Sequence, residues 1–305
     1  MTHTQVGEHD PTNAYQSLSE TTAHDDPRWA FGTGFEEVGA EITAPVPDGV
    51  DVADLAAYCL MLGDDALVLS HRLAEWAADA PELEEEMALA NIALDLLGQA
   101  RVLLARAGHV EQADRDEDAL AYLREQAEFR NVTLVEPADD RDFAHCIARL
   151  LVFSTWRLAL LQRLRRSADP VVAAVAEKGV KELAYHRDHA ALWTVRLGDG
   201  TDESHRRMRA ALDRVWPFVD ELFRTSAEER RLVVAGVATD PAGARAEFDD
   251  VVAQVLDAAT LDRPDRPAAG TIGGRGGRQG VHTEALGHVL DVMQSLARRH
   301  LGATW

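Results

Sequence analysis

Glu182, His186 and His189 are the side chains whose types and spacing best suit metal chemistry. They follow one another at intervals of four and three, which places them on one face of an α-helix. A di-iron centre in a helical bundle takes a Glu from each of two helices and Glu-x-x-His from each of the other two. Here the third residue after Glu182 is Tyr185, and the histidine comes one position later. A di-iron oxygenase with an unconventional ligand set, centred on these three side chains, is therefore one hypothesis.

Asp95 and Gly98 mark a second candidate segment, where polar residues interrupt an apolar surround. Asp95-x-x-Gly98 has the spacing of a ligand pair but contains no imidazole. The other long apolar segments supply isolated polar groups, namely Asp64, Asp65, Glu75, His145 and Arg149. Two irons need roughly four carboxylates and two histidines. We therefore favour a degenerate metal site, with no catalytic residue, metal or cofactor in this chain.

Lys178 and Lys181 are the only lysines in a chain that otherwise uses arginine as its cation. We hypothesise that the Lys181 ammonium lies where metal-binding bundles hold their ions and neutralises Asp95 and Glu182. The alternative is that both lysines are solvated surface groups, which is the stronger expectation for Lys178.

A glycine-rich segment, residues 270–280, contains Arg275 and Arg278. It lacks the Gly-Lys-Ser/Thr ending of a Walker loop, and no predicted strand precedes it. Its two arginines are candidates for contact with a phosphate of coenzyme A or with an acidic partner. A helical acyl-CoA-binding module is therefore a further alternative, and a plain mobile connector is the simplest one. Thr283 is expected to cap the helix that follows.

The elements that must position these residues are predicted to be helices throughout. Ala, Leu and Val dominate, aromatic residues make up only 6% of the chain, and no segment alternates with a period of two. Gly108 is expected to end the second helix. The pattern indicates a four-helix bundle with additional C-terminal helices. Helices are predicted over residues 52–78, 81–107, 118–131, 141–167, 170–197, 204–223, 241–261 and 283–300.

The chain is predicted to contain one folded domain, residues 51–305, preceded by a disordered or loosely docked extension over residues 1–50. That extension is rich in Thr, His, Asp, Gly and Pro and lacks sustained periodicity. A formal charge of −21 argues against a nucleic-acid partner. Two isolated cysteines, with no signal peptide and no run of about 18 apolar residues, predict a cytoplasmic protein without disulfides or a membrane span.

Five blocks of sequence, taken in order, resemble the C subunits of phenylacetyl-CoA epoxidase (ring 1,2-epoxidase), within the phenylacetic acid catabolic protein family. The resemblance extends from about Val52 to Trp305, and the first fifty residues fall outside it. The blocks are residues 63–76, 81–101, 181–186, 197–202 and 280–288.

This resemblance implies an all-α, ferritin-like fold and a role in aerobic phenylacetate degradation. In this family a homologous catalytic subunit holds the di-iron centre and epoxidises the aromatic ring of phenylacetyl-CoA. The C subunit has lost its metal ligands and stabilises the catalytic one. The implied partners are that di-iron protein, other epoxidase subunits and an NADPH-dependent reductase. The degenerate site would lie at Asp95, Gly98, Lys181, Glu182, Tyr185 and His186.

Overall fold

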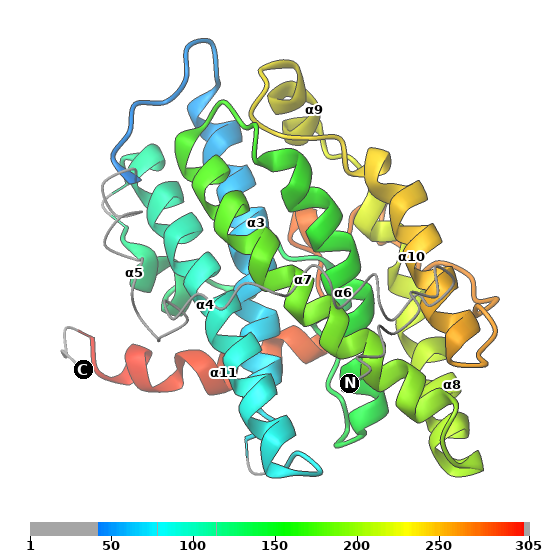
Figure 1. Ribbon diagram of the computed structural model, residues 1–305. Helices are drawn as coiled ribbons and strands as arrows, with labels where there is room; N and C mark the ends of the chain where they lie inside the picture. The colour runs from blue at the N-terminus through cyan, green and yellow to red at the C-terminus, as the bar shows by residue number, and fades with distance from the viewer. Residues whose placement is uncertain (1–41, 78, 114, 302–305) are drawn as a thin grey trace, which may run out of the picture. The chain divides into compact units, whose positions relative to one another are not determined.

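Four long helices form the centre of the computed structural model, which describes residues 42–301 except residues 78 and 114 (Figure 1). The sequence explains where they start. Asp51 caps α3 by accepting hydrogen bonds from the first-turn amides. Asp169 caps α7 in the same way, and Pro170 takes the first helical position. The four helices are α3 (Val52–Ala74), α4 (Leu83–Glu111), α6 (Phe143–Leu164) and α7 (Pro170–Gly198).

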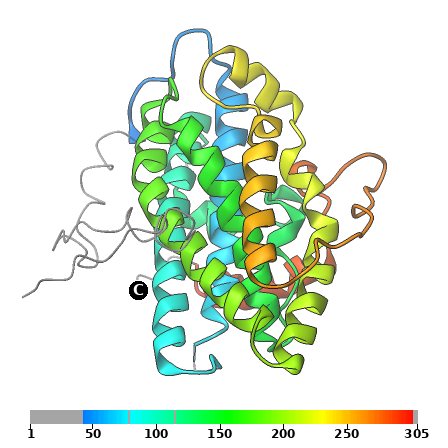
Figure 2. The ribbon, with the colours of Figure 1, turned by 45° about the vertical axis from the view of Figure 1, so that its right-hand side comes forward.

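The long helices pack in two pairs, α3 with α4 and α6 with α7, and α4 also contacts α7. In the described part of the chain, five shorter α-helices surround them: α5 (Glu117–Tyr122), α8 (Asp202–Val215), α9 (Ala227–Val234), α10 (Arg245–Ala258) and α11 (Glu284–Arg299). α8 and α10 cover α6 and α7, α9 packs on α3, and α11 packs on α5 and α3 (Figures 1 and 2). The described residues contain no β-strand beyond one isolated bridge, between Ile272 and Arg275. The all-α, ferritin-like prediction is confirmed.

Several predicted helix bounds are wrong, and proline or glycine chemistry explains most of them. The helix predicted over 204–223 ends at Val215, because Pro217 cannot continue the hydrogen-bond ladder and the chain turns into a 3-10 segment. The one predicted over 118–131 is the short α5 followed by a 3-10 turn, Gln126–Glu128. Gly108 does not end α4. The helix continues to Glu111, and Gln112 caps it in the left-handed conformation.

α6 is the core of the bundle, and its apolar residues are buried from Ala144 to Leu164. By length and composition, α6 and α4 could both cross a membrane, although neither contains an unbroken run of about 18 apolar residues. The apolar window of α6 is 100% buried and that of α4 is 56% buried. Burial of this kind is what a core helix of a bundle requires, so composition alone does not indicate a membrane span.

Residues 42–50, the last part of the predicted extension, run over the folded bundle. The backbone oxygens of Ile42 and Ala44 accept hydrogen bonds from Arg106, and Val46 and Val50 pack against the hydrophobic core. Residues 1–41, on which the rest of that prediction falls, lie outside the described residues.

Candidate functional site

Two consecutive acids of α3, Asp64 and Asp65, point into the interior of the bundle and are fully buried. Arg124 donates to both carboxylate oxygens of Asp64, one of them at 3.0 Å. Arg278 makes the same bidentate contact with Asp65, at 3.0 and 2.8 Å. Burying a carboxylate is costly unless a cation and hydrogen bonds offset the loss of water. Each acid of α3 is thus matched by an arginine from a distant segment.

Arg157 of α6 lies at the centre of the four long helices, with its side chain fully buried. It donates to the backbone oxygen of Leu62 on α3 at 3.1 Å, and its terminal nitrogen lies 3.7 Å from Asp65. On α4 it donates twice to the side-chain oxygen of Gln99, at 3.3 and 3.2 Å. Burial lowers the pKa of Arg157 to about 10, so the guanidinium remains charged at neutral pH. The interior, where bundles of this kind build metal sites, therefore holds a fixed organic cation.

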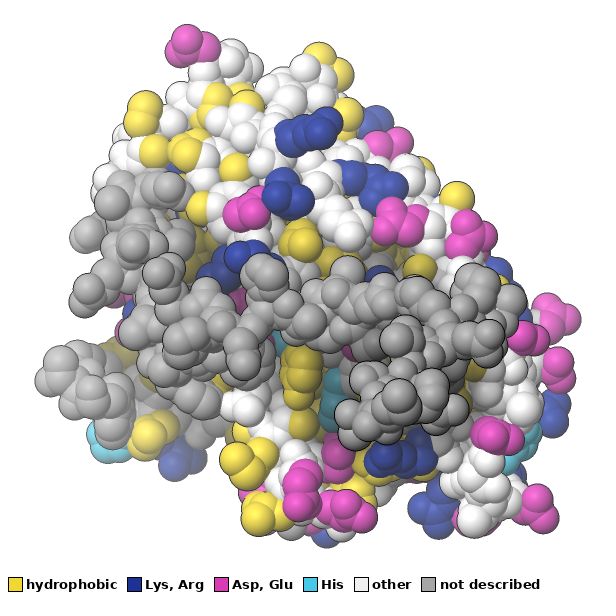
Figure 3. Space-filling model, in the orientation of Figure 1, with side chains coloured by type: hydrophobic (Ala, Val, Ile, Leu, Met, Phe, Trp, Pro, Cys, Tyr) yellow, Lys and Arg dark blue, Asp and Glu magenta, His cyan; other side chains and the backbone are white. Residues whose placement is uncertain are grey.

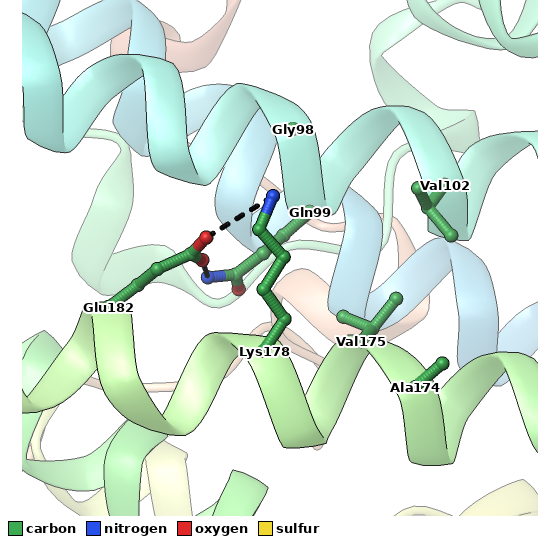
Figure 4. Close-up of a pocket in the computed structure, with 7 residues that line it drawn as sticks. All are labelled: Gly98, Gln99, Val102, Ala174, Val175, Lys178 and Glu182. Carbon is green, nitrogen blue, oxygen red and sulfur yellow. Dashed lines mark hydrogen bonds and ion pairs between the residues drawn. The ribbon is translucent and has the colours of Figure 1, made fainter. Parts of the chain in front are cut away.

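Glu182 of α7 accepts a hydrogen bond from the side-chain amide nitrogen of Gln99 at 2.9 Å (Figure 4). Its second oxygen lies 3.6 Å from the Lys178 ammonium, which reaches over it from one helical turn away. Burial, and then the nearby Asp95 carboxylate, raise the pKa of Glu182 above its usual range. The cavity beside these groups, which Gly98 also lines, has a volume of about 20 Å³. That is room for about one water molecule, so this pocket cannot admit an aromatic substrate.

His186 is fully buried and its Nε2 lies 3.0 Å from the Asp95 carboxylate across the α4–α7 seam. One helical turn further on, the His189 ring lies 3.3 Å from Glu85. Burial, and then the neighbouring His186, lower the pKa of His189 to about 4. The Tyr185 ring lies over both histidines at the surface, with centroids 6.3 and 6.2 Å away. His186 is thus hydrogen-bonded to a carboxylate of α4, whereas the close approach of His189 to Glu85 is not a hydrogen bond.

The predicted site residues divide into two groups. The structure brings Asp95, Gly98, Glu182 and His186 together at the α4–α7 seam. Lys181 and Tyr185 lie on the exposed side of α7. The placement of Lys181 corrects its predicted role, since the ammonium beside Glu182 belongs to Lys178 and the buried cation is Arg157.

The donor set does not fit a di-iron centre. No group of three or more His, Cys, Asp or Glu side chains among the described residues could hold a metal ion. Asp95 is paired with His186, Glu182 accepts from Gln99, and a guanidinium occupies the interior between the helices. A positive charge fixed in the interior opposes the binding of a metal cation there.

Arg275 and Arg278, predicted to act together, have different environments. Arg275 is exposed, in the tight turn that the isolated bridge closes. Arg278 points inward, where it also donates to the backbone oxygens of Met61 and Arg130. This corrects the expectation for Arg278, because its donors are taken up by the chain itself.

Sequence reasoning missed a second buried cluster, built around Glu136. One carboxylate oxygen lies within 2.7 Å of the His282 ring, and the other accepts from the Thr283 backbone amide and hydroxyl. Thr283 stands at the N-cap position of α11, as predicted, but its hydroxyl serves Glu136 and not the helix. Buried charged groups can be recognised in the sequence where a charged residue interrupts an apolar run, as Arg157 does.

The fold and this interior define a class: an all-α, ferritin-like bundle whose centre is closed by ion pairs. The family described as phenylacetic acid catabolic protein matches residues 44–305. The chain is also 44% identical, over 251 residues, to the C subunit of 1,2-phenylacetyl-CoA epoxidase from Escherichia coli. That match covers 82% of this chain and 99% of the relative. The chain therefore belongs to the phenylacetic acid catabolic protein family.

Proposed function

We propose that this chain is a non-catalytic structural subunit of a multicomponent phenylacetyl-CoA epoxidase in aerobic phenylacetate degradation. It pairs with and stabilises a homologous catalytic subunit that holds the di-iron centre, in the cytoplasm. Other epoxidase subunits and an NADPH-dependent reductase complete the system. The relative named above is the C subunit of such an epoxidase, which supports the assignment at the level of the complex.

The observation that carries the structural role is the position of Arg157. Its guanidinium is fully buried between α3, α4 and α6, in contact with Gln99 and close to Asp65. Glu182, the acid that a di-iron hypothesis needs most, is bound to Gln99 instead. A bundle stabilised by these contacts does not need iron in order to fold. Its role is then to support a neighbouring subunit that holds the iron.

A Glu182→Gln variant separates this proposal from the rival di-iron oxygenase. The substituted amide keeps an oxygen that accepts from Gln99, so the fold is preserved while a metal ligand is lost. The complex should be co-purified with the catalytic subunit, and its iron content and epoxidation of phenylacetyl-CoA measured. We expect both to equal those of the unchanged complex. Loss of about half the iron would establish the rival hypothesis.

The pairing itself has a separate test. The chain purified alone is expected to be poorly soluble or self-associated, because its partner surface is uncovered. Co-expression with the catalytic subunit is expected to give a well-behaved complex. Identical solution behaviour with and without that subunit would contradict the pairing. Titration of the isolated chain with phenylacetyl-CoA tests the acyl-CoA-binding alternative, to which Arg275 remains available, and binding there would favour that alternative.

A further inference from the structure

Hydrogen bonds fasten the N-terminal end of α11, which runs across α3 and α4 (Figure 1), to the segment that precedes α6. The carboxylate of Glu136 accepts from the backbone amide and the hydroxyl of Thr283, both at 2.7 Å. The side chain of Arg72 donates to the backbone oxygens of both Glu136 and Ala285. His282 stands directly before this junction and contacts Glu136, and both side chains are fully buried. The buried pair of Glu136 and His282 is thus part of what holds α11 in place.

Both ring nitrogens of His282 face hydrogen-bond acceptors. Nδ1 lies 2.7 Å from a carboxylate oxygen of Glu136, and Nε2 lies 3.0 Å from the backbone oxygen of Phe129. A neutral imidazole has one N–H group and one bare nitrogen, so one of these contacts would set a nitrogen lone pair against an oxygen lone pair. His186, by contrast, is hydrogen-bonded through Nε2 alone. The contacts of His282 therefore require either two N–H groups on the ring or a proton on Glu136.

The other donors around Glu136 place that proton on the ring. Asn131 donates at 3.0 Å to the same carboxylate oxygen that His282 contacts, and Thr283 donates twice to the other oxygen. Hydrogen bonds donated to a carboxylate favour its ionised form. The carboxylate also lies at the N-terminal end of α11, where the helix dipole favours negative charge. An ionised Glu136 beside a doubly protonated His282 satisfies every one of these contacts.

The other charged groups on the elements around this pair leave the assignment unchanged. Arg130 donates to the same oxygen of Phe129 at 2.7 Å, and its charge opposes a second proton on the ring, but it does not remove the need for two donors. The remaining acids have other partners or are exposed, so Glu136 is the carboxylate directed at the ring. These surrounding groups are Asp64 (paired with Arg124), Asp65 (with Arg278), Glu75 (with Arg72), Glu221 (with the amides of Thr133 and Gly277), and the exposed Glu284 and His288.

A buried ion pair of this kind differs from the surface pairs of the protein. On the face drawn in Figure 3, acidic and basic side chains lie in contact with solvent, which screens them. Loss of the proton from the buried pair would leave an uncompensated carboxylate in the interior. We propose that His282 is doubly protonated in the folded protein and that this proton fastens α11, so that α11 loosens as the pH rises. This proposal goes beyond the proposed function and does not rest on it.

The protonation state of the ring can be read directly by NMR of the full-length protein with ¹⁵N-labelled histidine. The spectrum is recorded at about pH 7.5, one unit above the ordinary range of an unfolded histidine. The His282 signals are identified from the backbone assignment, so this test needs no variant. We expect both ring nitrogens of His282 to carry a proton in the folded protein, and only one of them in the chain unfolded by urea. A bare nitrogen on the His282 ring of the folded protein would overturn the proposal.

Amide hydrogen exchange of α11, corrected for the intrinsic effect of pH, tests the attachment itself. Once α11 opens, His282 releases its second proton above about pH 6.5. The opening constant of α11 should therefore rise by up to about tenfold per pH unit between about pH 6.5 and 8.5. His282→Gln should remove this rise, because the amide does not titrate. His288→Gln, at an exposed position of the same helix, is the matched control and should keep it. An opening constant that is independent of pH in the unchanged protein, or that rises equally in His282→Gln, would overturn the proposal.

Discussion

The guanidinium of Arg157 and the side-chain oxygen of Gln99 meet in the bundle interior through two hydrogen bonds, at 3.3 and 3.2 Å. The side-chain amide nitrogen of Gln99 in turn donates a hydrogen bond to Glu182 at 2.9 Å. A cation on α6, an amide on α4 and a carboxylate on α7 thus form one polar chain across the bundle. Because Gln99 orients its oxygen toward the cation and its nitrogen toward the anion, both buried charges gain a matched dipole.

Replacing Arg157 with methionine is expected to lower the free energy of unfolding by about 3–5 kcal/mol, the usual result of removing one partner from a buried ionic network. Gln99 would lose its donor, and Asp65 one of its two cations. Urea denaturation monitored by circular dichroism measures the change.

Arg207→Met is the control for that substitution, because Arg207 pairs with Glu203 at 2.7 Å on the surface with its side chain 55% exposed. Exposed pairs contribute up to about 1 kcal/mol. Equal losses in the two variants would show that Arg157 is not part of a buried network.

Arg278→Ala is expected to release the glycine-rich loop and to destabilise the protein by about 3–5 kcal/mol, since Asp65 would lose its bidentate partner. Faster amide hydrogen exchange over residues 276–282 is the accompanying local signal. Arg275→Ala, three residues away but exposed, should change stability by less than about 0.5 kcal/mol. If the two variants behaved alike, the inward placement of Arg278 would be wrong.

The contrast between Arg275 and Arg278 shows what sequence reasoning can and cannot reach. Helical spacing predicted that Glu182 and His186 share one face of a helix, because the two residues are four positions apart. Asp65 finds Arg278 at a separation of 213 residues, and no local pattern encodes that pairing. Arg157 was open to prediction, as a lone cation in the apolar run 150–161. Its partners were not, since Leu62 and Gln99 come from other helices.

The close approach of Arg115 to α4 at Gly108 gives a test in which helix propensity and packing oppose each other. A Cβ atom at Gly108 would lie 1.9 Å from the Arg115 backbone oxygen. Alanine is the better helix former by about 1 kcal/mol, yet we expect Gly108→Ala to cost about 1–3 kcal/mol, because the backbone must shift. Gly243→Ala, where nothing lies within 4 Å, is expected to be neutral or slightly stabilising. A gain in thermal stability for Gly108→Ala would show that this contact does not form.

His145 should make the protein sensitive to acid. Its ring is buried 3.4 Å from Asp139, and burial lowers its pKa to about 4, although Asp139 acts in the opposite direction. The folded state then binds the proton more weakly than the unfolded chain, whose histidine titrates near 6.5. The contribution of the neutral His145 ring to the free energy of unfolding is therefore complete above pH 6.5 and is lost as the pH falls toward 4.

Urea denaturation of His145→Gln at a series of pH values tests this directly. Between pH 6.5 and 4 the free energy of unfolding of the unchanged protein should fall more steeply than that of the variant. The difference in slope is at most about 1.4 kcal/mol per pH unit, the value for one proton. His109→Gln, at an exposed position of α4, should keep the steeper slope. Parallel curves for the unchanged protein and His145→Gln would mean that the buried imidazole takes up its proton without opposing the fold.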